Sequence, residues 1–195
     1  MTVSSTRCCR RVDLLGVVVA FVLAFASALA SPAHAQGIEV KRPTVTIADD
    51  HYALDAQFDI SLTPTLEEVL NKGVPLHFLL EFELIRPRWY WFNDRVVYLR
   101  QEYRMSYNAL TRQYRLGVGN LHQNFSTLAE ALELMSRVRR RVDVEPGVLR
   151  RDGTYLAGLR FRLDTSQLPK PFQLNALVAR EWNVGSDWYR WQATP

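Results

Sequence analysis

The 195-residue sequence contains little cysteine and little lysine. Cys8 and Cys9 are its two cysteines, both near the start, and three of the 24 cationic side chains are lysines. Beyond these first residues the chain therefore has no thiolate nucleophile, no disulfide and no cysteine-ligated metal. Charged residues make up 23% and hydrophobic residues 48%, which is an ordinary globular composition and excludes a disordered or collagen-like chain.

Familiar catalytic and metal-binding motifs are also missing. The chain has no Gly-x-Ser-x-Gly or Ser-x-x-Lys motif for a nucleophilic serine and no His-Glu-x-x-His motif for zinc. His51, His77 and His122 are too scattered to nominate a catalytic triad. The segment 117–119, Gly-Val-Gly, lacks the third glycine of a dinucleotide loop, and we interpret it as a strand end with a bulge or turn. We expect no metal, no cofactor and no catalytic residue.

Residues 1–35 have the features of a secretory signal peptide. Three arginines precede an apolar stretch over residues 14–30, and Ala33 and Ala35 are the small residues that signal peptidase reads. We expect cleavage between Ala35 and Gln36, and therefore a periplasmic protein. An uncleaved inner-membrane anchor is the alternative, but the stretch is short for a span, which needs about 20 apolar residues.

Cleavage changes the charge of the chain. It removes three arginines and one aspartate, so the formal net charge falls from +4 to +2. This charge is too small to indicate nucleic acid as a partner. Residues 36–195 contain no repeat, linker or low-complexity segment, so we expect one domain, without a stable membrane span once the signal peptide is gone.

Alternation of apolar and polar residues predicts a protein rich in strands. Period two indicates half-buried strands over residues 52–62, 76–86, 95–107, 114–118 and 155–163. Short strands joined by turns, with one buried face, are typical of antiparallel sheets. We therefore expect a mainly β (α+β) fold, an antiparallel β-sandwich-like domain with two short helices.

The two helices are expected where capping signals occur. Thr65 and Glu68 have the spacing of a capping box, and Gly73 suits the residue after the helix end. Thr127 and Glu130 indicate the second helix, which we expect to end in the arginines of residues 137–141 before a strand resumes. The alternative for these arginines is contact with anionic lipid. Two prolines, at 169 and 171, predict a loop.

Charged residues on the polar side of the strands suggest cross-strand pairs. Glu81 and Glu83 are expected on the exposed side, beside Arg100, Arg160 and Arg162, where such pairs help set the register. A third hypothesis is an enzyme that uses a carboxylate pair such as Glu81 and Glu83. An exposed position beside arginines gives no reason for the raised pKa that an acid catalyst needs, so we expect no enzymatic activity.

Aromatic residues cluster in two places. Four occur in succession over residues 89–92, between two strands, and the tail adds three tryptophans and a tyrosine. Successive strand residues point to opposite faces, so one core face cannot bury all four. Either the tail packs on the hairpin, or the aromatics form a binding surface together with flanking arginines. The candidate binding residues are Arg86, Arg88, Trp89, Tyr90, Trp91, Phe92, Arg95, Trp182, Trp188 and Trp191.

The arrangement resembles a proteobacterial family known as domain of unknown function 4390. The resemblance rests on Asn-Lys-Gly-Val-Pro-Leu at 71–76, Trp-Tyr-Trp-Phe-Asn-Asp at 89–94 and Ser-Asp-Trp-Tyr-Arg-Trp at 186–191. It covers nearly all of residues 38–192 and implies no activity or catalytic residue. It implies an envelope protein, often encoded beside a membrane sensor histidine kinase of the nitrogen-regulation type.

Two hypotheses of different classes follow from these observations. The first is a non-enzymatic periplasmic protein that binds another envelope protein, with the sensor kinase as the named candidate. The second is a small-ligand or glycan-binding module that uses the aromatic clusters as a stacking platform.

Overall fold

Two central strands follow directly from the alternation of apolar and polar residues. In the computed structural model, β3 spans Leu76–Arg86 and β8 spans Tyr155–Leu163, the same bounds that the sequence predicts. The two strands pair antiparallel, with Phe82 opposite Leu159. One side of each strand therefore lies in the core, and the other side points outward.

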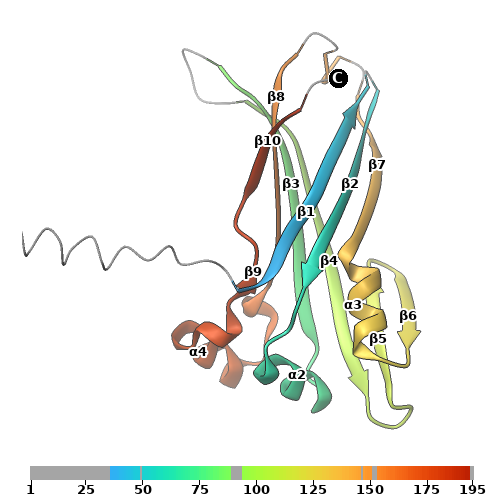
Figure 1. Cartoon of the computed structure of the whole chain (residues 1–195), viewed down its shortest axis with the longest axis vertical. Coiled ribbons are helices and arrows are strands. Elements are labelled where there is room, and N and C mark those ends of the chain that lie inside the picture. Colours follow the sequence, from blue (N-terminus) through green and yellow to red (C-terminus); the bar gives the residue numbers. More distant parts are fainter. Residues whose placement is uncertain (1–35, 49, 89–93, 146, 151–152, 194–195) are drawn as a thin grey trace, which may run out of the picture. The chain divides into compact units, whose positions relative to one another are not determined.

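The structure describes residues 36–193 apart from 49, 89–93, 146 and 151–152, and these residues belong to one compact unit (Figure 1). The expected signal peptide with Ala35 lies outside the described residues. The four consecutive aromatics Trp89, Tyr90, Trp91 and Phe92 lie outside them as well.

The strands form one sheet in the order β6-β5-β4-β3-β8-β9-β1-β2-β7, and β10 pairs with β8 beside this path. The remaining bounds are β1 Gln36–Ile47, β2 His51–Ile60, β4 Asp94–Asn108, β5 Gln113–Val118, β6 Leu121–Phe125, β7 Arg137–Asp143, β9 Val184–Gly185 and β10 Tyr189–Ala193. The sheet is mixed, because β1 runs parallel to β9, whereas β1 and β2 pair antiparallel.

The sheet curls so that β1, β2 and β7 lie across the core from β3 and β4 (Figure 1). Aromatic rings join the two sides. Tyr52 on β2 stacks on Phe82 with ring centroids 5.4 Å apart, and Phe58 on β2 meets Phe161 on β8 at 5.1 Å. The prediction of a mainly β fold with helices is confirmed. The sandwich-like appearance comes from one curled sheet rather than from two separate antiparallel sheets.

Three α-helices accompany the sheet in the described part of the chain: α2 Pro64–Asn71, α3 Leu128–Ser136 and α4 Lys170–Val178. Thr127 caps α3 as predicted, because its side chain accepts a hydrogen bond from the Glu130 backbone. The cap of α2 is Thr63 rather than Thr65, since Pro64 suits the first helical position, where no N–H is needed. Gly73 follows α2 with a φ of +88°, as its predicted role requires.

The arginines of residues 137–141 form β7 instead of the end of a helix. The helix stops at Ser136, and Ala56 pairs with Val138 and Leu54 with Arg140 in an antiparallel ladder. Val138 is buried, while Arg139 forms an ion pair with Asp55 at 3.0 Å. Residues 137–143 therefore form a strand rather than a helix, because pairing with β2 buries Val138 on one side of this segment and leaves Arg139 on the other.

Residues 170–178 form α4 where the two prolines predicted a loop. Pro171 lies in the first turn of the helix, where a missing N–H costs nothing. Two short 3₁₀ turns flank α4, at Thr165–Gln167 and Arg180–Trp182. The second turn contacts α2, because Thr65 donates a hydrogen bond to the Glu181 carboxylate at 2.7 Å. Helices α2 and α4 thus lie at the end of the sheet where β1 begins (Figure 1).

Candidate functional site

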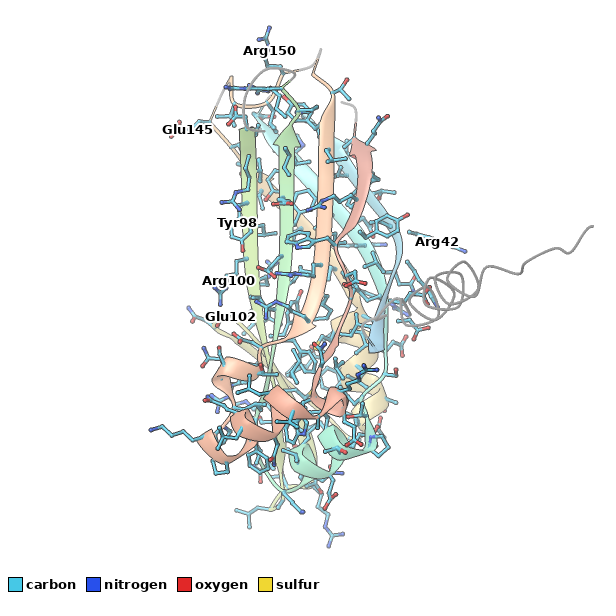
Figure 2. All side chains as sticks on the ribbon, turned by 90° about the vertical axis from the view of Figure 1, so that its left-hand side faces the viewer. Arg42, Tyr98, Arg100, Glu102, Glu145 and Arg150 are labelled. Carbon is cyan, nitrogen blue, oxygen red and sulfur yellow. The ribbon has the colours of Figure 1, made fainter. Side chains whose placement is uncertain are left out.

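The outward side of β4, β3, β8 and β10 carries a continuous set of charged and aromatic side chains. Figure 2 shows Tyr98, Arg100 and Glu102 along β4 on this side of the unit and Arg42 away from it. We call this surface the arginine–aromatic face. It comprises Glu81, Glu83, Arg95, Tyr98, Arg100, Arg160, Arg162, Trp188 and Arg190.

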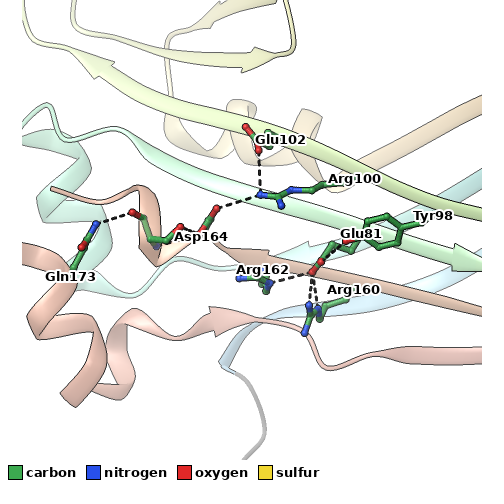
Figure 3. Close-up of polar contacts among 9 residues, drawn as sticks. Glu81, Tyr98, Arg100, Glu102, Arg160, Arg162, Asp164 and Gln173 are labelled. Atoms are coloured by element: carbon green, nitrogen blue, oxygen red, sulfur yellow. Dashed lines mark hydrogen bonds and ion pairs between the residues drawn. The ribbon is translucent and has the colours of Figure 1, made fainter. Parts of the chain in front are cut away.

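Glu81 lies at the centre of the face and receives hydrogen bonds from three side chains. Arg160 donates to its Oε2 atom from Nε at 3.0 Å and from Nη2 at 2.5 Å. Arg162 donates from Nε to the same oxygen at 3.2 Å, and the Tyr98 hydroxyl donates to Oε1 at 2.9 Å (Figure 3). Both carboxylate oxygens are therefore occupied.

These hydrogen bonds determine the charge of Glu81. Burial by itself would raise the pKa of this carboxyl, but the hydrogen bonds from Arg160, Tyr98 and Arg162 outweigh burial and lower the pKa. Glu81 is thus an anion at neutral pH. The pKa of the Tyr98 hydroxyl is raised, by burial and by its hydrogen bond to the Glu81 carboxylate.

Glu83 is the second buried carboxylate of the face. Its oxygens lie 4.0 Å from Arg95 Nη1 and 3.7 Å from Arg190 Nη2. Gly158 on β8 provides the space beside it, since a Cβ atom there would lie 3.0 Å from Glu83 Cγ and 3.3 Å from the Trp188 ring. The absence of a side chain at Gly158 lets a glutamate and a tryptophan pack against the same point of β8.

Trp188 lies among the arginines of this face. The guanidinium carbon of Arg160 is 4.7 Å from a Trp188 ring centroid, and that of Arg190 is 5.8 Å away. Arg95 stacks in the same way over Tyr98, at 4.8 Å. Cation–π contacts and ion pairs together favour these positions of the long side chains.

A second group of polar contacts continues the face toward α4. Arg100 lies 3.4 Å from Glu102 and 3.9 Å from Asp164. Asp164 accepts hydrogen bonds from the backbone N–H and the hydroxyl of Ser166, and Gln173 donates to the Ser166 carbonyl at 2.7 Å (Figure 3). The start of α4 is therefore connected to β4 through charged and polar side chains.

The expected exposure of Glu81 and Glu83 is wrong, although their pairing with arginines is confirmed for Glu81. The two residues are 6% and 7% exposed. Glu81 lies directly opposite Arg160 in the ladder, so the register itself places a cation beside it. Trp188 also packs on this side of the sheet, although it lies 25 residues after Leu163 in the sequence. The periodicity of a strand does not reveal such a long-range contact.

Two of the predicted binding residues, Arg95 and Trp188, lie near each other in the structure. Arg95 pairs with Glu83, Glu83 also pairs with Arg190, and Arg190 lies over the Trp188 ring. Arg86 is the last residue of β3 and Arg88 follows two residues later; they approach Asp94 at 3.8 and 2.8 Å, respectively. Arg86 also donates to the Val148 carbonyl at 2.9 Å. These two arginines are therefore engaged by neighbouring parts of the same chain.

The three tail tryptophans do not share one surface. Trp182 is 4% exposed and packs on Phe172 with ring centroids 5.5 Å apart. Trp191 points to the core side of β10, 6.4 Å from the Phe82 ring, whereas Trp188 lies on the outward side. A single stacking platform built from all three is therefore not formed. Their packing on residues 89–92 falls outside the described residues.

The described residues contain no group of three or more His, Cys, Asp or Glu side chains that could hold a metal ion. Within the same part of the chain, no helix combines the length and apolar character needed to cross a membrane. The arginine–aromatic face presents guanidinium groups and aromatic rings, and two buried carboxylates, Glu81 and Glu83, pair with the guanidinium groups.

Comparison with known proteins identifies a family. The model of a family described as a domain of unknown function (DUF4390) matches residues 35–192. No curated protein and no solved structure matches the chain.

Proposed function

The chain belongs to the DUF4390 family, whose description assigns no activity, and we propose that it is an exported, non-enzymatic protein that binds an acidic segment of another envelope protein on its arginine–aromatic face. The observation that carries this proposal is the pair of buried glutamates that hold four arginines in place.

The four arginines remain accessible while their positions are fixed. The side chains of Arg160 and Arg162 are 27% and 37% exposed, and those of Arg190 and Arg95 are 52% and 59% exposed. Fixing long side chains before binding reduces the entropy lost on association. Guanidinium groups also match carboxylates geometrically, so an acidic segment is the partner chemistry that suits this face best.

The composition of the face supports a protein partner. Arginine, tryptophan and tyrosine dominate the residues that contribute most to binding at protein interfaces, whereas lysine is depleted there. The face presents Trp188, Tyr98 and five arginines, and no lysine belongs to it. Separate pieces of the chain supply these residues, but the sheet holds them on one rigid surface.

The proposal of a non-enzymatic protein rests on the state of the carboxylates. An acid catalyst requires a carboxyl whose pKa is raised so that it keeps its proton near neutral pH. The pKa of Glu81 is lowered, and both of its oxygens are occupied by hydrogen-bond donors. Glu81 is thus suited to holding arginines in position rather than to transferring protons.

We propose export because residues 1–35 have the arginines, the apolar stretch and the cleavage site of a signal peptide. The partner would then be exposed in the bacterial envelope. The resemblance noted above makes the exported part of a nitrogen-regulation-type sensor histidine kinase the first candidate partner to test.

Replacing Arg95 and Arg190 together by glutamine is expected to abolish partner binding and, because Glu83 loses both of its cations, to lower the stability of the fold as well. The tagged protein is purified from envelope fractions of the native host after brief chemical cross-linking, and its partner is quantified by mass spectrometry. Losing these two arginines should reduce the recovered partner by at least about tenfold, because hot-spot residues typically contribute 2 kcal/mol or more.

The matched control replaces Arg42 and Arg180, which are also exposed arginines and lie outside the face. This variant has the same change in charge and should recover the partner as well as the wild type does. A folded Arg95/Arg190 variant that retains the partner at the level of the control contradicts the proposal.

A further inference from the structure

A small hollow lies on the outward side of the β4–β5–β6 hairpins, opposite the side that α3 covers. Its volume is about 170 Å³, and it is lined by Arg104, Ser106, Arg115, Gly117 and His122. Every side chain in this lining is polar or cationic. The residues differ from those of the arginine–aromatic face, so an inference from them does not depend on the proposed function.

The two arginines of the hollow differ from those of the face because no residue in the described part of the chain gives them an acidic partner. None of the described residues forms an ion pair or a side-chain hydrogen bond with Arg104 or Arg115, whereas Arg160 and Arg162 both bind Glu81. Both guanidinium groups are exposed. Two like charges on one small surface repel each other, and an anion from solution that binds both removes this repulsion.

The register of the strands places these arginines as diagonal neighbours. Arg104 on β4 pairs with Gly117 on β5, and Ser106 pairs with Arg115. Diagonal neighbours on one side of a sheet have Cα atoms roughly 7–8 Å apart, and the long guanidinium side chains can converge on a single group between them. Ser106, which lies opposite Arg115 and two residues after Arg104, adds a hydroxyl donor beside the two cations.

His122 on β6 also lines the hollow, because Gly117 on β5 leaves room for its ring. Gly117 pairs with His122 on β6, so Arg104, Gly117 and His122 form one row across three strands. A Cβ atom at Gly117 would lie 2.9 Å from His122 Nδ1, so a side chain here would displace the ring. The glycine therefore lets the imidazole lie over β5, at the edge of the hollow.

Carboxylates do not line the hollow. The nearest one along β4 is Glu102, and Arg100 already lies 3.4 Å from it. The field of Arg104 reaches the adjacent strand, because burial and, second, Arg104 lower the pKa of His77 and outweigh the opposite effects of Glu102 and Asp164. The surface is thus positive and has donors in several directions, which is the chemistry that a tetrahedral oxyanion requires.

We propose that this hollow binds a phosphate group, with Arg104 and Arg115 as its charged ligands and with Ser106 and His122 as further hydrogen-bonding ligands. Arginine is suited to this role because its planar guanidinium donates two parallel hydrogen bonds to phosphate oxygens. The phosphate comes either from a free phosphate-bearing solute or from a lipid headgroup, and both sources share the same binding chemistry.

The test is a titration of the folded domain with inorganic phosphate at constant ionic strength, followed by NMR. Wild-type protein should show saturable shifts at residues 104–106, 115–117 and 122. The Arg104→Gln and Arg115→Gln variants should each bind about tenfold more weakly, since each loses charge-assisted hydrogen bonds. Arg42→Gln has the same charge change away from the hollow, and its titration should match the wild type.

A second arm identifies the source of the phosphate. Phosphatidylcholine vesicles with and without phosphatidic acid are tested for co-sedimentation with the wild type and with Arg104→Gln. Binding that needs both phosphatidic acid and Arg104 indicates a lipid headgroup, whereas phosphate binding without vesicle binding indicates a soluble ligand. Wild-type protein that shows no saturable shift, or variants that bind phosphate as well as Arg42→Gln does, would overturn the proposal.

Discussion

Replacing Glu81 by alanine is expected to lower the free energy of unfolding by about 2–3 kcal/mol. The change removes the carboxylate that accepts hydrogen bonds from Arg160, Arg162 and Tyr98 and leaves two half-buried guanidinium groups without a partner. The loss is smaller than for a fully buried pair because both arginines can turn toward water. Urea unfolding at neutral pH measures the difference.

Two further variants separate charge from shape. Glu81→Gln keeps the size of the side chain and an acceptor for Tyr98, and we expect it to cost about 1–2 kcal/mol. Glu102→Gln removes an exposed carboxylate of the neighbouring strand, where ion pairs contribute at most about 1 kcal/mol. Equal effects of Glu81→Gln and Glu102→Gln would show that burial gives Glu81 no special role.

The stabilisation by Glu81 should depend on pH in a defined direction. Its pKa is lowered in the folded protein from the ordinary value of 4.5. The charge therefore stabilises the fold fully above that value, and the stabilisation is lost as the pH falls toward the lower, folded-state pKa. The difference in stability between wild type and Glu81→Gln should shrink in acid, and a difference that stays constant there would contradict the assignment.

Replacing Phe161 by alanine is expected to destabilise the protein by about 3–5 kcal/mol. Phe161 lies on the core side of β8, between two outward-pointing arginines, and is fully buried. Its ring lies 5.1 Å from Phe58 on β2 and 5.4 Å from Tyr103 on β4, so it joins the two sides of the curled sheet. Removing it leaves a cavity that both sides share.

Denaturant unfolding compares this variant with Leu121→Ala. Leu121 is 78% exposed on β6, and its replacement should change the stability by about 0.5 kcal/mol or less. Phe161→Ala should also weaken partner binding, because Arg160 and Arg162 follow the position of β8. A loss of stability below about 1 kcal/mol for Phe161→Ala would contradict the central position of this ring.

The sequence predicts those elements whose residues alternate without interruption. The bounds of β3 and β8 agree with the prediction because each strand buries one side along its whole length. Strand β1 was not predicted as one element, since a bulge between Lys41 and Thr44 shifts its register and Arg42 has a positive φ. Strand β6 is largely exposed at the edge of the sheet, so it lacks the alternation.

The candidate site was only partly visible in the sequence. The aromatic surroundings of Arg95 and Trp188 predict them as binding residues, but strand alternation places the carboxylates of the face on an exposed side. Their burial depends on Gly158, which leaves room beside β8, and on Trp188, which approaches from the tail. Contacts of this kind depend on how distant segments meet, and no local pattern encodes them.

The most direct test of the arginine–aromatic face is photo-crosslinking in living cells of the native host. A crosslinking amino acid replaces Gln192, which is exposed on β10 two residues after Arg190, or Gln57, which is exposed on β2 in the other half of the sheet. We predict an adduct from position 192, absent from position 57, whose crosslinked peptide is an acidic segment of one envelope protein. Equal adducts from both positions, or none from position 192, would contradict the account.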